Sequence, residues 1–280
     1  MNKIKISSYL YPENKYLKFV LKNIIYPLVI LSIIFYLISY LMLLKTDKIA
    51  VLDNTSVYVS DGMTENRDSI VKYVQYGMEK ARRKGINTNL NVKIVFCQTS
   101  IEYRMRCLMF TKSIAQTKDF MRRIIISPMS DSSKNEKDIN DNQTDTVYVP
   151  RYCDEIISHE LTHIYQYEKF GVRRYCQLFS EKWKIEGYAD FIAGSSSLKT
   201  SLGERMFLEG KYSDESLEIC ESVFVNYFVG RLRTDYLLNF KRITEDEYWK
   251  TSYDVDKLDE EIRDALRCGE YKIFRQNDYE

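Results

Sequence analysis

The longest hydrophobic run of the chain lies near its N-terminus, where residues 23–44 contain no charged side chain. A helix of that length spans about 33 Å, enough to cross the hydrocarbon core of a bilayer. Lys22 and Lys45 bracket the run, and no small-x-small cleavage site follows it. A cleaved signal peptide is therefore the less favoured interpretation, and the pattern predicts one transmembrane anchor.

Charge on either side of this run predicts its orientation. The segment after it carries only Lys45 and Lys48, with Asp47 between them. The segment before it has one acid, Glu13, and the lysines Lys3, Lys5, Lys15, Lys18 and Lys22. Because basic residues stay on the cytoplasmic side, we expect a cytoplasmic N-terminus and an extracytoplasmic domain over residues 45–280.

After the anchor, the spacing of hydrophobic positions alternates between the periods of strands and helices. Strands are predicted at residues 56–60, 92–97, 123–128 and 146–149, and early helices at residues 67–84 and 99–110. The first of these helices shows apolar residues at Ile70, Val74, Met78 and Ala81. Residues 129–145 are mostly Ser, Asp, Asn and Lys, and they predict a loop.

The second half of the chain has a helical pattern. Helices are predicted at residues 152–168, 181–194, 213–240, with a break near Gly230, and 257–267. The fold class is therefore α+β, with a small mixed sheet and helices packed on a helical subdomain. The predicted organisation is a tail (1–22), the anchor (23–44), a linker (45–55) and one domain (56–280), sheet-rich to residue 150 and helical from residue 151.

Composition excludes some functions. The 280 residues carry a net charge of +1, and they include no Gly-rich phosphate loop and no Cys-x-x-Cys pair. Nucleic acid and nucleotide partners are thus not supported. Six cysteines, all after the anchor, suit disulfides in an oxidising compartment, and buried free thiols are the equal alternative.

The two histidines of the chain fall in one motif, His159-Glu160-Leu161-Thr162-His163, which reads H-E-x-x-H. On a helix, residues four apart differ by about 40° around the axis and about 6 Å along it, so both imidazoles project from one face. That spacing lets both rings bind one zinc ion, while the intervening Glu160 reaches an attacking water. A surface helix carrying the motif by chance is the alternative.

A second motif follows at Glu186-Gly187-Tyr188-Ala189-Asp190. Catalytic zinc needs a third protein ligand and an open fourth position. Glu186 is the best candidate for that ligand, because it lies in the next predicted helix. Asp190, four residues later on the same face, can serve as a carboxylate partner of a ligand side chain.

Together, the two motifs resemble the gluzincin class of zinc metallopeptidases, also described as thermolysin-like or peptidase MA-like. The resemblance implies a zincin-like fold, with His159, His163 and Glu186 as Zn²⁺ ligands and Glu160 as general base. It also implies that Asp190 orients a ligand histidine, His159 in our interpretation. The zinc helix then lies beneath a sheet edge that pairs with extended substrate, for which residues 123–128 or 146–149 are the candidates.

Gluzincins commonly use a Tyr or His to stabilise the oxyanion. No third histidine exists in this chain, which leaves Tyr175, Tyr188 and Tyr227 as unranked candidates. The resemblance thus implies a membrane-anchored zinc metallopeptidase that hydrolyses a peptide or protein substrate. An endopeptidase is favoured, because the Gly-x-Met-x-Asn motif of aminopeptidases is absent from the sequence.

Three alternatives remain at this point. Membrane-anchored proteases of the CaaX-processing and heat-shock type share Glu-x-x-Ala-Asp, but they usually have several spans. A catalytically silent zincin-like ectodomain would bind a protein or cell-wall partner, and such a scaffold has no use for Glu160. A purely structural zinc is disfavoured, because two His and one Glu with an open position form the catalytic pattern.

Overall fold

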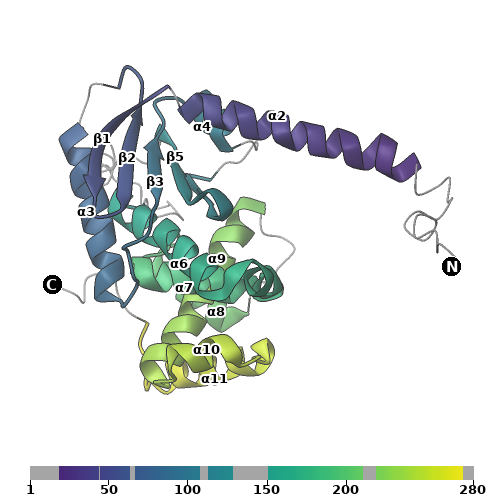
Figure 1. Ribbon diagram of the computed structural model, residues 1–280. Helices are drawn as coiled ribbons and strands as arrows, with labels where there is room; N and C mark the ends of the chain where they lie inside the picture. Colours follow the sequence, from purple (N-terminus) through teal and green to yellow (C-terminus); the bar gives the residue numbers. More distant parts are fainter. Residues whose placement is uncertain are drawn as a thin grey trace, which may run out of the picture.

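The computed structural model describes residues 19–43, 45–63, 67–107, 113–128, 151–210 and 219–273 (Figure 1). It has the predicted mixed α and β character, with a five-stranded mixed sheet and helices packed against it. The predicted strand at residues 146–149 and the predicted loop at residues 129–145 lie outside the described residues.

The sheet has the strand order β1-β2-β3-β5-β4. Its strands are β1 (Thr46–Leu52), β2 (Thr55–Ser60), β3 (Lys93–Phe96), β4 (Ala115–Lys118) and β5 (Arg123–Ile126). The three central strands β2, β3 and β5 run parallel, and both outer strands pair antiparallel.

Strand β1 corrects the prediction of a linker over residues 45–55. It pairs with β2 through a tight turn at Asp53 and Asn54, where Asp53 has a φ of 50°. Asp and Asn tolerate positive φ at the centre of such two-residue hairpins. The turn therefore closes a hairpin where a linker was predicted.

Of the two predicted sheet edges, residues 123–126 do not form an edge of the described sheet, and residues 146–149 lie outside the described residues. Residues 123–126 form β5, which lies between β3 and β4 with all four residues buried. A continuous Arg-Ile-Ile-Ile run suits such an interior strand, because both of its faces are covered. The outer strand is β4, whose Ala-Gln-Thr-Lys sequence lacks the apolar alternation of a half-buried strand.

Predicted helices appear at the expected places as α3 (Arg67–Arg83), α4 (Ser100–Cys107), α6 (Cys153–Leu178), α7 (Lys182–Ala193), α9 (Ile219–Asp235) and α11 (Val255–Arg267). Two helices were not predicted, α8 (Thr200–Glu209) and α10 (Glu245–Lys250). Short turns of other helix types lie at Asp119–Met121 (η3), Phe179–Glu181 (η6) and Tyr236–Phe240 (η8).

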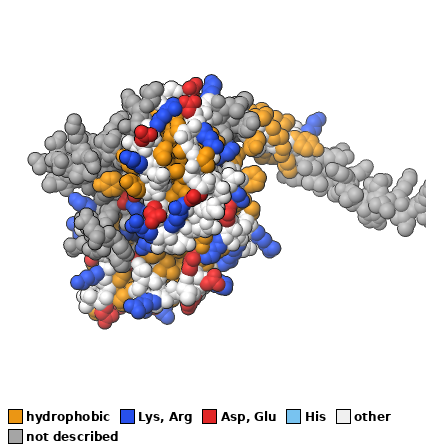
Figure 2. Space-filling view, turned by 60° about the vertical axis from the view of Figure 1, so that its left-hand side comes forward, with side chains coloured by type: hydrophobic (Ala, Val, Ile, Leu, Met, Phe, Trp, Pro, Cys, Tyr) orange, Lys and Arg blue, Asp and Glu red, His pale blue; other side chains and the backbone are white. Residues whose placement is uncertain are grey.

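Helix α2 (Tyr26–Leu43), preceded by the π-helical turn η2 (Leu21–Ile25), covers most of the predicted anchor and projects from the rest of the molecule (Figure 1). Its apolar side chains, including Leu28, Ile30 and Ile33, are exposed and gather on this helix in Figure 2. No helix in the described ranges is long and apolar enough to cross a membrane. The anchor over residues 23–44 thus stays a prediction.

Two hydrophobic cores share helix α6. Its N-terminal half packs with α3 against the sheet, where Ile157 and Leu161 meet Ile94 and Ile124. Its C-terminal half belongs to a second core among the helices, which contains Tyr175 and Leu178. Gly171, at φ 67° and ψ 165°, interrupts the helix between them. The zinc motif therefore lies where the sheet and the helical part meet.

The described cysteine side chains form no disulfide. Cys97, Cys107, Cys153, Cys176 and Cys268 are free thiols, and the first three are buried. Burial raises the pKa of the Cys107 thiol to about 11, which keeps it protonated. For these five residues the free-thiol alternative holds. The side chain of Cys220 lies outside the described part.

Candidate metal centre

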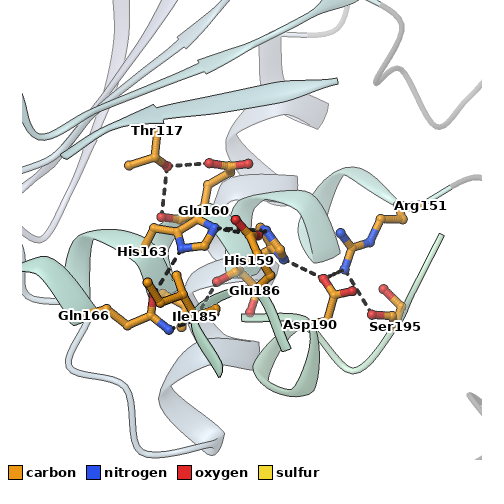
Figure 3. Close-up of polar contacts among 12 residues, drawn as sticks. Thr117, Arg151, His159, Glu160, His163, Gln166, Ile185, Glu186, Asp190 and Ser195 are labelled. Carbon is orange, nitrogen blue, oxygen red and sulfur yellow. Dashed lines mark hydrogen bonds and ion pairs between the residues drawn. The ribbon is translucent and has the colours of Figure 1, made fainter. Parts of the chain in front are cut away.

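Two helices bring the three predicted ligands to one point. His159 and His163 project from α6, and Glu186 projects from α7 (Figure 3). The two Nε2 atoms lie 3.1 Å apart. Glu186 Oε2 lies 3.5 Å from His159 Nε2 and 3.4 Å from His163 Nε2. The three potential ligand atoms form a nearly equilateral triangle.

The size of this triangle fits a tetrahedral zinc ion. With ligand bonds of about 2.0–2.1 Å, neighbouring ligand atoms of a tetrahedral site lie about 3.3 Å apart. The three separations of 3.1, 3.4 and 3.5 Å bracket that value. Two imidazoles and one carboxylate are also a donor set that zinc prefers. The residues therefore fit the ion that the sequence predicts.

Each histidine has a partner at the ring nitrogen that faces away from the triangle. His159 Nδ1 lies 2.7 Å from Asp190 Oδ1, as the sequence analysis expected. His163 Nδ1 lies 3.1 Å from Gln166 Oε1, and Gln166 Nε2 donates to the main-chain oxygen of Ile185 at 3.0 Å. Acceptors at Nδ1 favour a proton there, so the neutral form of each ring keeps its lone pair on Nε2, facing the triangle.

Asp190 is itself held by a buried arginine. Arg151 Nη2 donates to Asp190 Oδ1 and to the main-chain oxygen of Ser195, the latter at 3.0 Å. Burial alone would raise the pKa of Asp190, but Arg151 and His159 outweigh it and hold the pKa below its usual range. Arg151 keeps Asp190 ionised as an acceptor for His159. Sequence reasoning missed Arg151, which is 39 residues away in the chain.

Glu160, the predicted base, is nearly buried and contacts the outer strand of the sheet. Thr117 Oγ1, on β4, donates to the Glu160 carboxylate and lies 3.2 Å from the main-chain oxygen of the same residue (Figure 3). The contact places β4 directly beside the triangle of ligands. No pattern in the sequence singles out Thr117, because the contact joins positions 43 residues apart.

The site concentrates ionisable groups in a buried space. Burial would lower the pKa of His163, but Glu186, Glu160 and Asp119 outweigh it and raise the pKa to about 10. The pKa of His159 is also raised, because Asp190 and Glu186 outweigh its burial. Burial likewise opposes ionisation of Glu186, yet the two imidazoles hold its pKa well below the usual range. Without metal, the ligands form a hydrogen-bonded ion cluster.

A further acid, Asp119, lies beside this cluster at the end of β4. Burial raises its pKa to about 6, and its charge interacts with those of His163 and Glu160. Its carboxylate accepts a hydrogen bond from the Tyr175 hydroxyl. Asp119 was not among the predicted site residues.

The structure separates the three tyrosine candidates. Tyr188 follows Glu186 by two residues, which turns it about 200° around the helix. Its ring packs 5.1 Å from Trp249, in the helical core and away from the ligands. The Tyr227 ring lies 6.4 Å from that of His159, and Tyr175 contacts Asp119. Tyr188 therefore lies away from the site, whereas Tyr175 and Tyr227 lie beside it.

A close crossing of two helices sets the position of Glu186. Gly187 on α7 faces Gly230 on α9, and a Cβ at Gly187 would lie 2.3 Å from the carbonyl carbon and oxygen of Gly230. Helix α9 runs unbroken through Gly230, which corrects the predicted break there. Because Gly230 has no side chain, α7 can approach α9 closely at this point.

No known protein family model and no curated protein matches the chain. Functional inference therefore rests on the chemistry of the site itself.

Proposed function

We propose that this protein is a zinc metallopeptidase of the gluzincin type, anchored by its N-terminal apolar segment. The observation that carries the proposal is the triangle of His159, His163 and Glu186. The acceptor Glu160 lies on α6, the helix that carries the two histidines. Both ring nitrogens that face outward have acceptors, Asp190 and Gln166. Such outer partners are typical of built metal sites.

Each residue has a role in peptide-bond hydrolysis. His159, His163 and Glu186 hold zinc, which when bound supplies Lewis acidity to a scissile carbonyl and to a water molecule. Glu160 takes a proton from the attacking water and passes it to the leaving amine. A tyrosine hydroxyl, from Tyr175 or Tyr227, donates to the oxyanion. Asp190 and Gln166 hold the imidazoles in the tautomer that leaves Nε2 for the metal.

Strand β4 is the surface that we propose for the substrate. Within the described part of the chain, β4 is the outer strand of the sheet next to the cluster of His159, His163 and Glu186. An extended peptide can add to such an edge as a further strand. Because Thr117 on β4 contacts Glu160, a peptide bound along this strand would lie beside the proposed base. An edge-bound, extended substrate favours an endopeptidase over an exopeptidase.

The test is the metal content of the full-length chain, together with cleavage of a peptide library with and without a chelator. We expect one zinc per chain and chelator-sensitive cleavage. His159→Ala, His163→Ala and Glu186→Ala should each lose metal. Glu160→Gln should keep zinc and lose turnover by roughly 10²- to 10⁴-fold, because the amide cannot accept the proton.

Two results would contradict the proposal. Metal loss in Glu160→Gln equal to that of the histidine variants would remove the base role. A zinc-loaded wild-type chain that cleaves no library member would favour the alternative of a catalytically silent, binding ectodomain.

A further inference from the structure

Thr117 contacts the proposed base from a part of the fold that is distant in the sequence. It lies on β4, opposite Ile124 of β5, and its Oγ1 donates to Glu160 Oε2. The same oxygen lies 3.2 Å from the main-chain oxygen of Glu160. The hydroxyl thus contacts both the carboxylate and the backbone of one residue, which places Thr117 against the surface of α6 (Figure 3).

The hydroxyl belongs to a rigid support. Threonine is branched at Cβ and is therefore restricted about χ1, and the ladder with β5 continues on both sides of Thr117, at Gln116 and Lys118. Glu160, in contrast, has a long side chain with several rotatable bonds. A fixed donor on the strand removes much of that freedom, and it occupies one of the two carboxylate oxygens.

We infer that Thr117 is a positioning residue for Glu160, an inference that rests on the proposed peptidase function. Its hydroxyl holds Oε2, so that Oε1 receives the proton of the attacking water. The strand that would pair with the peptide thereby also orients the base. Substrate and base are then aligned by one element, and catalysis depends on the Thr117 hydroxyl although it does not touch the reacting atoms.

Valine and serine at position 117 separate the hydroxyl from the shape of the side chain. Thr117→Val keeps the branched shape and the strand propensity but removes the donor, whereas Thr117→Ser keeps the donor. Thr55→Val is the matched control, because it removes a buried strand hydroxyl that contacts the main-chain oxygen of Leu90, away from the site. All variants are made in the full-length chain, loaded with zinc and assayed on the best peptide from the library.

We expect Thr117→Val to bind zinc with unchanged stoichiometry, to keep its KM and to lose kcat by roughly 10- to 100-fold, since a misplaced catalytic group costs about that much. Thr117→Ser should restore most of kcat, and Thr55→Val should match wild type. A second readout is independent of turnover: in crystal structures of the zinc-loaded proteins, the Glu160 carboxylate should move in Thr117→Val and return in Thr117→Ser.

Several outcomes would overturn the inference. Equal kcat values in Thr117→Val and wild type would do so, as would a serine variant as slow as the valine variant. An unchanged Glu160 carboxylate in the Thr117→Val crystal structure would also remove the positioning role. Failure of the proposed function itself gives a different result, namely a zinc-loaded wild type without any chelator-sensitive cleavage.

Discussion

At the scale of single residues, the contact between Asp190 and His159 is the feature most open to a direct test. Loss of such an outer partner typically costs about 10- to 100-fold in metal affinity. We expect Asp190→Asn to fold and to bind zinc more weakly by about that factor, a smaller loss than that of Glu186→Ala. Zinc titration of the two variants beside wild type measures the effect. Asp246→Asn, on the exposed surface of α10, is the control, and an unchanged dissociation constant in Asp190→Asn would leave Asp190 without a role at the metal.

The protonation of the ligands gives a second prediction at this scale. The pKa of His163 is raised to about 10, so its imidazole is protonated at pH 7 in the metal-free chain, and the pKa of His159 is raised in the same direction. Metal binding needs the neutral rings. We therefore expect zinc to displace protons at pH 7, and its apparent affinity to rise as the pH rises towards 10. Calorimetric titration in two buffers with different ionisation enthalpies counts the protons, and a buffer-independent heat would contradict the prediction.

The same pKa shifts determine whether the stability of the fold rises or falls with pH. A histidine whose folded pKa is raised stabilises the metal-free chain below its unfolded pKa of about 6.5, and this contribution is lost as the pH rises through the folded value. The stability of the zinc-loaded chain should instead rise with pH over the same range, because the metal binds more tightly as the rings lose their protons. The two forms thus differ in the slope of stability against pH.

At the scale of elements, the crossing of α7 and α9 positions the third ligand. A Cβ at Gly187 would meet the backbone of Gly230, which has no side chain to move aside. We expect Gly187→Ala to destabilise the fold by roughly 1–3 kcal/mol, although alanine favours helices by about 1 kcal/mol. Because Glu186 is the adjacent residue, zinc affinity should fall as well.

Chemical denaturation and zinc titration measure both effects. Ser201→Ala, at an exposed position of α8, is the control for added helix propensity. A Gly187→Ala chain as stable as wild type, with unchanged zinc affinity, would show that the two helices do not depend on this close approach.

The helices and strands that sequence predicted well are those with strong local patterns. Ile70, Val74 and Met78 repeat at helical spacing and are buried in α3. That His159 and His163 lie side by side was predictable for the same reason, because four-residue spacings on a helix determine which side chains share a face. The predicted helix break at Gly230 was wrong. Glycine is a poor helix former, and only the packing of α7 against α9 explains why a glycine lies inside this helix.

What sequence could not predict depends on contacts between distant segments. Strand β4 owes its existence to pairing with β5, because Gln116 and Thr117 have no apolar alternation to mark them. Arg151 and Thr117 reach the site only through the tertiary fold, from 39 and 43 residues away in the chain. Such long-range partners leave no local signature.

At the scale of the whole molecule, α6 joins the two halves of the domain. One half of this helix is buried against the sheet and the other against the helical core. Strand β4 contacts Glu160 on α6 through Thr117, and α7 brings Glu186 to His159 and His163. The proposed ligands and base all lie on α6 and α7, but the contact of the base with Thr117 requires the sheet, so the site depends on both halves of the domain.

The orientation of the molecule at a membrane is the last prediction. Apolar side chains, including Leu28, Ile30 and Ile33, are exposed on the described part of α2 (Figure 2), and lysines precede it in the sequence. With the N-terminus in the cytoplasm, protease added to intact cells should degrade the domain or release a fragment of about 230 residues, roughly the length that follows the anchor. An epitope tag at the N-terminus should stay protected until the cells are lysed, with a cytoplasmic protein as the control for intact membranes. Full protection of the domain in intact cells, with digestion only after lysis, would reverse the orientation and place the metal centre in the cytoplasm.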